Sequence, residues 1–337
     1  MTVQEVGDAK AVQPGILVTI PFGSCVDWRF GTESERLSPV KAQRFVSAVE
    51  KEILRRAAEF KNRTFKTVYF GGSSPSVLTL EQLYRLIQAL FDNLTIQPEE
   101  QTLVGESGTL NPGKAKVIKE SGFDRFELRL QKWSDGAEAD FRLLREAGFP
   151  TVGVELAYCL DPKTWEQWLD RLMRLQPDHV TLYFPKRGGD PLAMLASYRL
   201  ARSRLGEAMT NYGLHHYARP GHECRYLRSL WSNCLLLGFG PAAITRTKAG
   251  LGVNPTRLAD YLTLVAQNQE KLPNPCDDVQ ELCNDLIQLA GISIRHVTHA
   301  QMRQLVGSGL MEKKGYKLFL TDQGVLALDR VMAVLRG

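Results

Sequence analysis

The chain has 337 residues, of which 44% are hydrophobic and 23% charged, a composition typical of a folded globular protein. Its net charge of +5 arises from 42 basic and 37 acidic residues spread along the chain, which does not indicate a nucleic-acid partner. No apolar run reaches the roughly 18 residues of a membrane span. Residues 1–14 are too polar for a signal peptide, so a flexible leader and a cytoplasmic protein are expected.

Six apolar, β-rich runs alternate with amphipathic helical patterns. The predicted strands cover residues 15–22, 67–70, 101–105, 123–131, 151–158 and 179–185. The first predicted helix spans residues 39–63, with Ser38 as its N-cap. Because each crossover helix returns the chain to the same end, six β–α units predict a parallel sheet. An open doubly wound sheet and an incomplete β/α barrel both fit, and both bind ligands at the C-terminal ends of their strands.

The second predicted strand runs directly into a glycine-rich turn, Gly71 to Ser76, with the sequence GGSSPS. Glycine at a strand end allows a ligand to approach the backbone, and the following helix can turn its N–H groups toward an anion. The same pattern also fits a plain β–α turn. The stretch alone does not decide between a ligand cradle and a turn.

Beyond residue 209 the pattern loosens. An extension from about residue 210 to 270, rich in glycine, arginine and aromatic residues, is expected to form a lid or a loosely packed edge. Residues 271–278 have the composition of a linker. Residues 279–337 predict two helices, a β-wing and a further helix, which together make a small winged-helix-like α+β domain. Its expected recognition helix has one arginine, which favours a packing role over DNA binding.

The order of motifs resembles the coproporphyrinogen dehydrogenase (oxygen-independent coproporphyrinogen III oxidase) and haem-chaperone family of the radical S-adenosylmethionine superfamily. The family's IPF, TVYFGGGTPS, GTLTPEKLKALKEAG, NRxSxGVQSFD, FAKPG, HNLxYW and YLGLGPGAHS are matched by residues 20–22, 67–76, 108–122, 124–135, 217–221, 226–231 and 235–245. The similarity runs from about Gly15 to the C-terminus. It implies an incomplete (β/α)6-type radical-SAM-like barrel over residues 15–270, followed by the small C-terminal domain.

The departures from the family concentrate at its iron–sulfur cluster. Three cysteines follow IPF in the family, whereas Gly23, Asp27 and Phe30 stand at those positions here and only Cys25 remains nearby. A [4Fe–4S] cubane is held by several thiolates, so Cys25 alone cannot hold one. The sequence therefore predicts no [4Fe–4S] cluster, no metal centre and no radical chemistry. The other cysteines lack ligand-like spacing and are expected to be reduced and structural.

The resemblance also implies a pocket for S-adenosylmethionine or a similar ligand. The family's strand-end glutamate falls on Val104, and Glu106 stands two residues later. The family's glutamine is kept, and its aspartate is replaced by a glutamate. The predicted pocket therefore comprises a backbone cradle and three polar side chains: Gly71, Gly72, Ser73, Ser74, Glu106, Gln131 and Glu155.

A second candidate site is for haem or a porphyrin. The histidine of the family's HNLxYW motif falls on Tyr226, while Trp231 is kept and His222 lies shortly before them. Histidine and tyrosine can both ligate haem iron. A surface loop with incidental histidines is the alternative.

Three hypotheses follow. The first is a cluster-less relative that binds a tetrapyrrole or an S-adenosylmethionine-like ligand in porphyrin metabolism without radical catalysis. The second is an enzyme of oxidoreductase or transferase type that uses the old pocket for non-radical chemistry on a porphyrin or an S-adenosylmethionine-related substrate. The third is a scaffold with an empty pocket. The expected partner is a small molecule, and a protein partner or a homodimer stays open.

Overall fold

The computed structural model describes residues 13–24, 33–184, 189–232, 234–268 and 278–337. Most of the predicted leader and linker, together with Cys25, lies outside these residues. Six parallel strands form the centre of the fold in consecutive order: β1 (Gly15–Ile20), β2 (Thr64–Gly72), β3 (Thr95–Glu106), β4 (Arg125–Leu130), β5 (Thr151–Ala157) and β6 (His179–Tyr183). A doubly wound sheet reverses its strand order at a switch point, whereas a barrel does not. The order is therefore that of a barrel, and the α/β class is confirmed.

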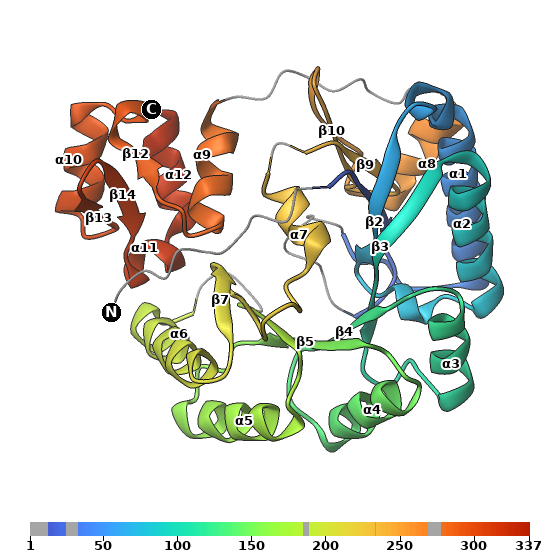
Figure 1. Cartoon of the computed structure of the whole chain (residues 1–337), viewed down its shortest axis with the longest axis horizontal. Coiled ribbons are helices and arrows are strands. Elements are labelled where there is room, and N and C mark those ends of the chain that lie inside the picture. Colours follow the sequence, from blue (N-terminus) through green and yellow to red (C-terminus); the bar gives the residue numbers. More distant parts are fainter. Residues whose placement is uncertain (1–12, 25–32, 185–188, 233, 269–277) are drawn as a thin grey trace.

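Six helices cover the outside of the curved sheet (Figure 1): α1 (Pro39–Arg56), α2 (Leu80–Asn93), α3 (Pro112–Glu120), α4 (Asp135–Glu146), α5 (Pro162–Leu175) and α6 (Pro191–Gly206). Each begins at a side chain that accepts a backbone N–H, as Ser38 does for α1 and Thr79 for α2. Helix α1 ends at Arg56 rather than at residue 63, because a 3-10 turn, Ala57–Phe60, follows it.

The extension after residue 209 lengthens both edges of the sheet. On one side, β9 (Leu236–Phe239) pairs in parallel with β1 and is followed by the antiparallel strands β10 (Ile244–Thr247) and β11 (Gly250–Val253). On the other, β8 (His216–Ala218) pairs antiparallel with β6, and β7 (Thr210–Gly213) forms the edge. Among the described strands no ladder joins β7 to β11, so hydrogen bonds do not close the barrel. Helix α7 (Arg225–Leu230) lies inside the curve, and α8 (Leu258–Ala266) packs on α1.

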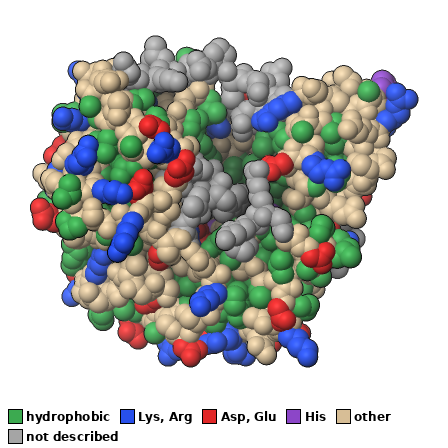
Figure 2. Space-filling model, turned by 180° about the vertical axis from the view of Figure 1, so that it is seen from behind, with side chains coloured by type: hydrophobic (Ala, Val, Ile, Leu, Met, Phe, Trp, Pro, Cys, Tyr) green, Lys and Arg blue, Asp and Glu red, His purple; other side chains and the backbone are tan. Residues whose placement is uncertain are grey.

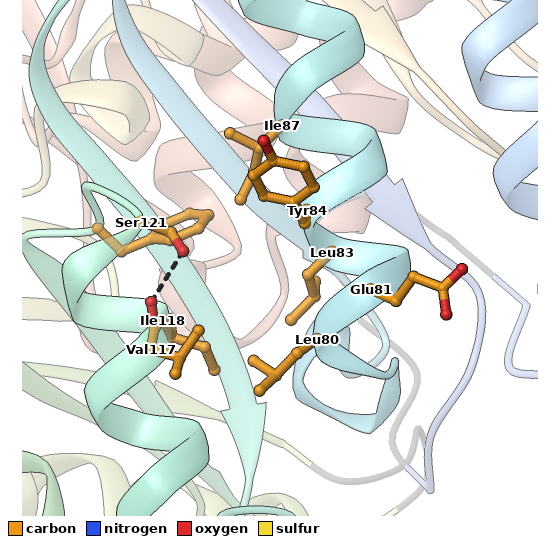
Figure 3. Close-up of a pocket in the computed structure, with 9 residues that line it drawn as sticks. Leu80, Glu81, Leu83, Tyr84, Ile87, Val117, Ile118 and Ser121 are labelled. Atoms are coloured by element: carbon orange, nitrogen blue, oxygen red, sulfur yellow. Dashed lines mark hydrogen bonds between the residues drawn. The ribbon is translucent and has the colours of Figure 1, made fainter.

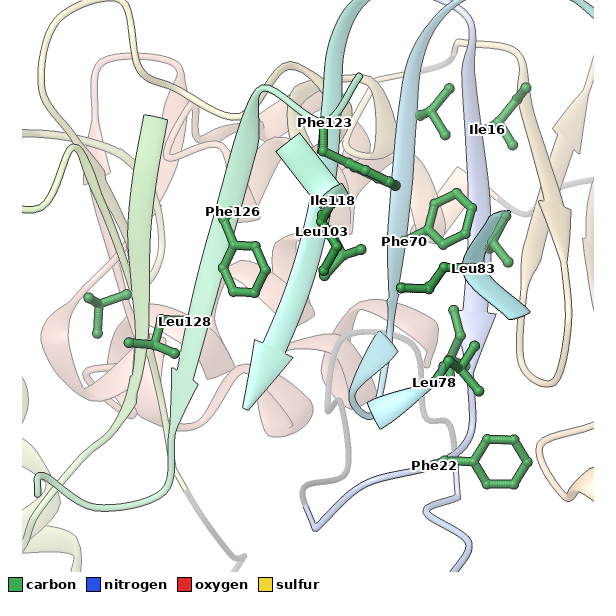
Figure 4. Packing of buried hydrophobic residues seen from close by; sticks show 14 of the residues in the cluster. Ile16, Phe22, Phe70, Leu78, Leu83, Leu103, Ile118, Phe123, Phe126 and Leu128 are labelled. Atoms are coloured by element: carbon green, nitrogen blue, oxygen red, sulfur yellow. The ribbon is translucent and has the colours of Figure 1, made fainter. Parts of the chain in front are cut away.

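The two faces of the sheet differ in chemistry. Phe70, Leu103, Phe126 and Leu128 belong to the apolar core between the sheet and its outer helices (Figure 4). The alternate positions of β4 are Arg125, Glu127 and Arg129, all buried. Because side chains alternate across a strand, these charged groups point to the opposite, inner face. The barrel interior therefore carries charged groups along β4, beside an apolar cluster that includes Leu17 and Tyr69.

The C-terminal segment has its own apolar core and a three-stranded sheet. Its elements are α9 (Asp278–Ile287), β12 (Ile292–Ser293), α10 (His299–Gly307), β13 (Met311–Lys314), β14 (Lys317–Leu320), α11 (Asp322–Leu326) and α12 (Leu328–Arg336). It contacts the open side of the barrel: Leu214 N donates to Ile287 O at 2.9 Å, and Gln288 Nε2 donates to Trp231 O at 2.7 Å.

The outer surface carries interspersed positive and negative side chains on the face shown in Figure 2. A shallow apolar groove of about 270 Å³ lies between α2 and α3, lined by residues including Leu80, Tyr84 and Val117 (Figure 3). Within the described part of the chain, no helix combines the length and the apolar character needed to cross a bilayer.

Candidate ligand-binding site

The predicted cradle lies where β2 ends. Gly72 has a φ of +91°, and a Cβ there would stand 2.6 Å from Ile20 O, so only glycine fits without strain. Ser73 and Ser74 follow and are fully buried. Their backbone N–H groups donate to Ile20 O and Phe22 O, each at 2.7 Å. The turn is thus fixed against the C-terminal end of β1, the end at which β/α folds bind ligands.

Gly72→Ala is expected to lower the free energy of unfolding by about 1–3 kcal/mol, because it adds both a strained φ and a backbone clash. Urea unfolding measures the change. Gly148→Ala is the matched control, since Gly148 has a φ of +84° and nothing within 4 Å of the added Cβ. Equal losses in the two variants would show that the contact with Ile20 does not constrain the turn.

Arg129 occupies the inner side of this cradle. Its Nη1 donates to Gly72 O at 2.7 Å and to Ser73 O at 2.5 Å, while its Nε donates to Glu155 Oε2 at 2.6 Å. Arg129 and Glu155 are only 3% and 2% exposed. The family motif that residues 124–135 resemble has glycine at the position of Arg129. The side chain of Arg129 therefore occupies space beside the predicted pocket that a glycine would leave empty.

Glu106 and Gln131 lie at the rim of the same end. The carboxylate of Glu106 accepts from Ser24 N at 2.7 Å and from Ser24 Oγ at 3.0 Å. Gln131, one residue beyond β4, donates its Nε2 to Ser24 O at 2.9 Å. Glu106 N in turn donates to Ser74 Oγ at 3.1 Å. The predicted pocket residues therefore gather at one end of the barrel, where Glu155 is buried and Glu106 and Gln131 are partly or largely exposed.

A second polar network fills the opposite end of the barrel interior. Glu127 accepts from Arg125 Nε at 2.7 Å and lies 3.2 Å from His179 Nδ1, and all three side chains are buried. Burial alone would raise the pKa of Glu127. The charges of His179 and Arg125 and their hydrogen bonds to the carboxylate outweigh burial and lower this pKa to about 2. Burial lowers the pKa of His179. Glu127 is therefore ionised at neutral pH.

Glu100 lies 3.8 Å from Arg125 Nη1 and joins this network to helix α7. Its carboxylate accepts the backbone N–H groups of Arg225 and Tyr226, each at 3.0 Å, and the thiol of Cys224 at 3.3 Å. The first backbone N–H groups of a helix have no acceptor within the helix, and Glu100 provides one for α7. The network therefore holds α7 inside the barrel.

The three predicted haem residues have different surroundings. His222 Nδ1 lies 2.9 Å from Thr151 Oγ1, at the first residue of β5 and so at the end opposite the cradle. Tyr226 is fully buried and stacks on Tyr69, with ring centroids 4.8 Å apart. Trp231 packs against His216 at 4.9 Å. The three side chains thus share no common partner among these contacts.

Trp231 lines a larger cavity of about 460 Å³ between the open side of the barrel and the C-terminal domain. His215, His216 and Arg246 line it from the barrel, and α9, α11 and α12 supply the other wall. Burial lowers the pKa of His215 to about 4, so its imidazole is neutral at pH 7. Arg246 donates to Leu230 O at 2.8 Å, which fixes its guanidinium beside the end of α7.

Arg129 and this cavity were not predicted from the sequence. The alternation of charged and apolar residues in β4 (RFELRL) was a usable signal for inward charges. The cavity had no such signal, because its walls come from segments more than 100 residues apart. Among the described residues no group of three or more His, Cys, Asp or Glu is placed to hold a metal ion. Cys25, Asp27 and Phe30 lie outside those residues, so the absence of the cluster stays a prediction.

Comparisons with known proteins agree on one group. No protein-family model matches the chain. The haem chaperone HemW of Bacillus subtilis is 22% identical, over 87% of this chain and 91% of the relative, and that of Mycobacterium tuberculosis is 24% identical, over 96% and 95%. The solved structure of coproporphyrinogen III oxidase (HemN) from Escherichia coli, a radical SAM enzyme, superimposes with a TM-score of 0.78 at 18% identity, over 96% of this chain and 90% of that one. The chain is therefore a homologue of haem chaperones and oxygen-independent coproporphyrinogen III oxidases, and it shares the fold of HemN.

Proposed function

We propose that this protein binds a tetrapyrrole, haem or a porphyrin, in haem metabolism and does so without radical chemistry. The cavity beside Trp231 is the observation that carries the proposal. Its volume of about 460 Å³ falls within the range of roughly 300–1,000 Å³ usual for small-molecule sites. The names of the related haem chaperones and coproporphyrinogen oxidases point to the same class of ligand.

The chemistry of the cavity suits a flat, largely apolar ligand that carries carboxylates. Trp231, Tyr183 and Phe184 offer aromatic surface, and the guanidinium of Arg246 is of the kind that pairs with carboxylates. His215 and His216 are in the same wall, and a neutral imidazole is the form that binds iron. The site thus combines the contacts expected for a porphyrin ring and its acidic side chains.

The non-radical part of the proposal rests on the donor set near the cradle. Gly23, at the first cysteine position of the resembling family, offers no ligand, and Cys25 supplies one thiolate. The residues present therefore do not fit a [4Fe–4S] cluster. Anaerobic reconstitution with iron and sulfide is expected to leave the protein without a visible iron–sulfur absorption band. A band with stoichiometric bound iron would contradict this.

Haem binding is expected to depend on the cavity that Trp231 lines and not on His222 or Tyr226. Leu251 lines the cavity and is half-buried, so Leu251→Trp should narrow it and weaken binding at least about tenfold, the effect of losing roughly 1.4 kcal/mol. Titration of the protein with haem, followed by absorbance and tryptophan fluorescence, gives the affinity.

Two variants serve as controls for this titration. Leu192→Trp makes the same change at a leucine that is 76% exposed on α6 and should bind haem like the wild type. The double variant His222→Ala/Tyr226→Phe should also bind normally, because these side chains contact Thr151 and Tyr69 rather than the cavity. Loss of binding in the double variant together with normal binding by Leu251→Trp would refute the assignment.

A further inference from the structure

Two arginines of the barrel converge on one carboxylate of the C-terminal domain. Arg199 Nε and Arg202 Nη1, both on α6, each donate to Asp322 at 2.8 Å. The two arginines are three residues apart, so they stand on the same face of the helix. Their side chains are 60% and 58% exposed, and that of Asp322 is 23% exposed. The ion pairs therefore join the two parts of the chain at a place where salt can screen the charges.

Helix α11 connects these ion pairs to the cavity beside Trp231. Asp322 is its first residue, and Val325 and Leu326 line the cavity about one turn later. Helix α11 packs on α6 (Figure 1), and Val325 belongs to the same apolar cluster as Tyr198 of α6. Movement of α11 away from α6 would therefore break the ion pairs and withdraw part of the cavity wall together.

Uncharged groups join the two parts on the α9 side of the cavity. Leu214 N donates to Ile287 O at 2.9 Å, and Gln288 Nε2 donates to Trp231 O at 2.7 Å. Such hydrogen bonds depend little on ionic strength, whereas the attraction between exposed charges weakens as the Debye length shortens. The attachment of α11 is therefore the one that should vary with salt.

We propose that Arg199, Arg202 and Asp322 form an electrostatic latch that controls how fast a ligand enters and leaves the cavity. With the latch closed, α11 stays against α6 and the cavity keeps its second wall. With the latch open, Val325 and Leu326 withdraw and the cavity is exposed to solvent. This control of the cavity rests on the proposed function, whereas the closure of α11 on α6 is a property of the ligand-free protein.

Hydrogen exchange in the ligand-free protein tests the latch directly. The variant Arg199→Gln/Arg202→Gln removes both cations and leaves α11 unchanged. The amides of α11, such as that of Val325, should exchange about fivefold faster in this variant than in the wild type, the order of effect expected from two partly exposed ion pairs. An increase in sodium chloride from about 20 mM to about 500 mM should speed exchange in the wild type but not in the variant.

Two further changes separate charge pairing from other effects of substitution. Arg204→Gln alters an arginine of the same helix that pairs with Asp170, and it should exchange like the wild type. Arg199→Glu/Arg202→Glu should exchange faster still, because both side chains then repel Asp322, and the addition of Asp322→Lys should slow exchange again. The latch is overturned if α11 exchanges equally in the wild type and in Arg199→Gln/Arg202→Gln, or if Asp322→Lys gives no recovery.

Haem release connects the latch to the cavity. Transfer of bound haem to an excess of apomyoglobin should be about fivefold faster from Arg199→Gln/Arg202→Gln than from the wild type or from Arg204→Gln. Faster hydrogen exchange in α11 together with unchanged haem release would overturn the control of the cavity by the latch. If haem does not bind, the proposed function fails and the role of the latch in haem release fails with it, whereas the closure of α11 is still decided by hydrogen exchange.

Discussion

Arg129→Met is expected to destabilise the protein by about 3–5 kcal/mol, because it leaves the Glu155 carboxylate and two backbone carbonyls buried without their donor. Glu155→Met should cost less, since Arg129 keeps its two carbonyl partners. The double variant Arg129→Met/Glu155→Met should be no less stable than Arg129→Met alone. The Glu155→Met change removes the buried carboxylate that Arg129→Met leaves without a partner. Urea denaturation of the four proteins gives the coupling energy.

A half-exposed ion pair provides the comparison. Arg204, whose side chain is 36% exposed, lies 3.1 Å from Asp170, and such surface pairs contribute about 0–1 kcal/mol. Arg204→Met should therefore change stability little. Additive losses in the Arg129 and Glu155 variants would mean that the two side chains do not stabilise each other.

Glu127→Gln is expected to cost about 3 kcal/mol at neutral pH and progressively less in acid. The pKa of Glu127 is about 2 in the folded protein and 4.5 in the unfolded chain. Between pH 4.5 and pH 2, Glu127 therefore binds a proton in the unfolded chain but not in the folded protein. The stability that Glu127 contributes is thus present above pH 4.5 and is lost as the pH falls toward 2. Each tenfold step in affinity corresponds to about 1.4 kcal/mol. Urea unfolding from pH 7 to pH 2.5 measures the difference from the wild type.

His179 changes stability in the same direction with pH. Its folded pKa is lowered, so below pH 6.5 the unfolded chain takes up a proton that the buried imidazole does not. The wild type should therefore begin to lose stability below that pH, before Glu127 titrates. Glu50→Gln is the control, because Glu50 pairs with Arg85 at a site where both side chains are about one quarter exposed. A difference between Glu127→Gln and the wild type that stays constant with pH would refute this role of Glu127.

The sequence predicted the six β–α units, because their strands, helices and turns are specified by residues close together in the chain. Each of the six β–α units has an apolar run, a capped helix and turn residues close together, as at Thr79 and Gln82 around the start of α2. The sheet edges lack such signals, because β7 to β11 have only three or four residues each. The pairing of β9 with β1 joins Leu236 to Gly15, and periodicity says nothing about so distant a partner.

The candidate site likewise has features that depend on local sequence and features that depend on distant partners. The conformation of Gly72 follows from local turn chemistry, and the structure has that turn at a strand end. The three haem candidates lie within ten residues of one another, yet their side chains contact Thr151, Tyr69 and His216. Nearness in sequence did not imply a shared site, because His222 precedes α7, Tyr226 lies in its first turn and Trp231 follows its end. The partner of Arg129 lies 26 residues away on the neighbouring strand and depends on sheet register.

The cavity beside Trp231 has walls from two parts of the chain that each have their own core. Leu214 and Trp231 on the barrel are joined to the C-terminal domain by two hydrogen bonds, to Ile287 O and from Gln288 Nε2. A molecule bound between the two parts contacts both, because residues of both line the cavity. Its binding energy is then shared between them, so a bound ligand should raise the stability of both parts together. Under the proposed function, the C-terminal domain therefore supplies one wall of the ligand site as well as its own core.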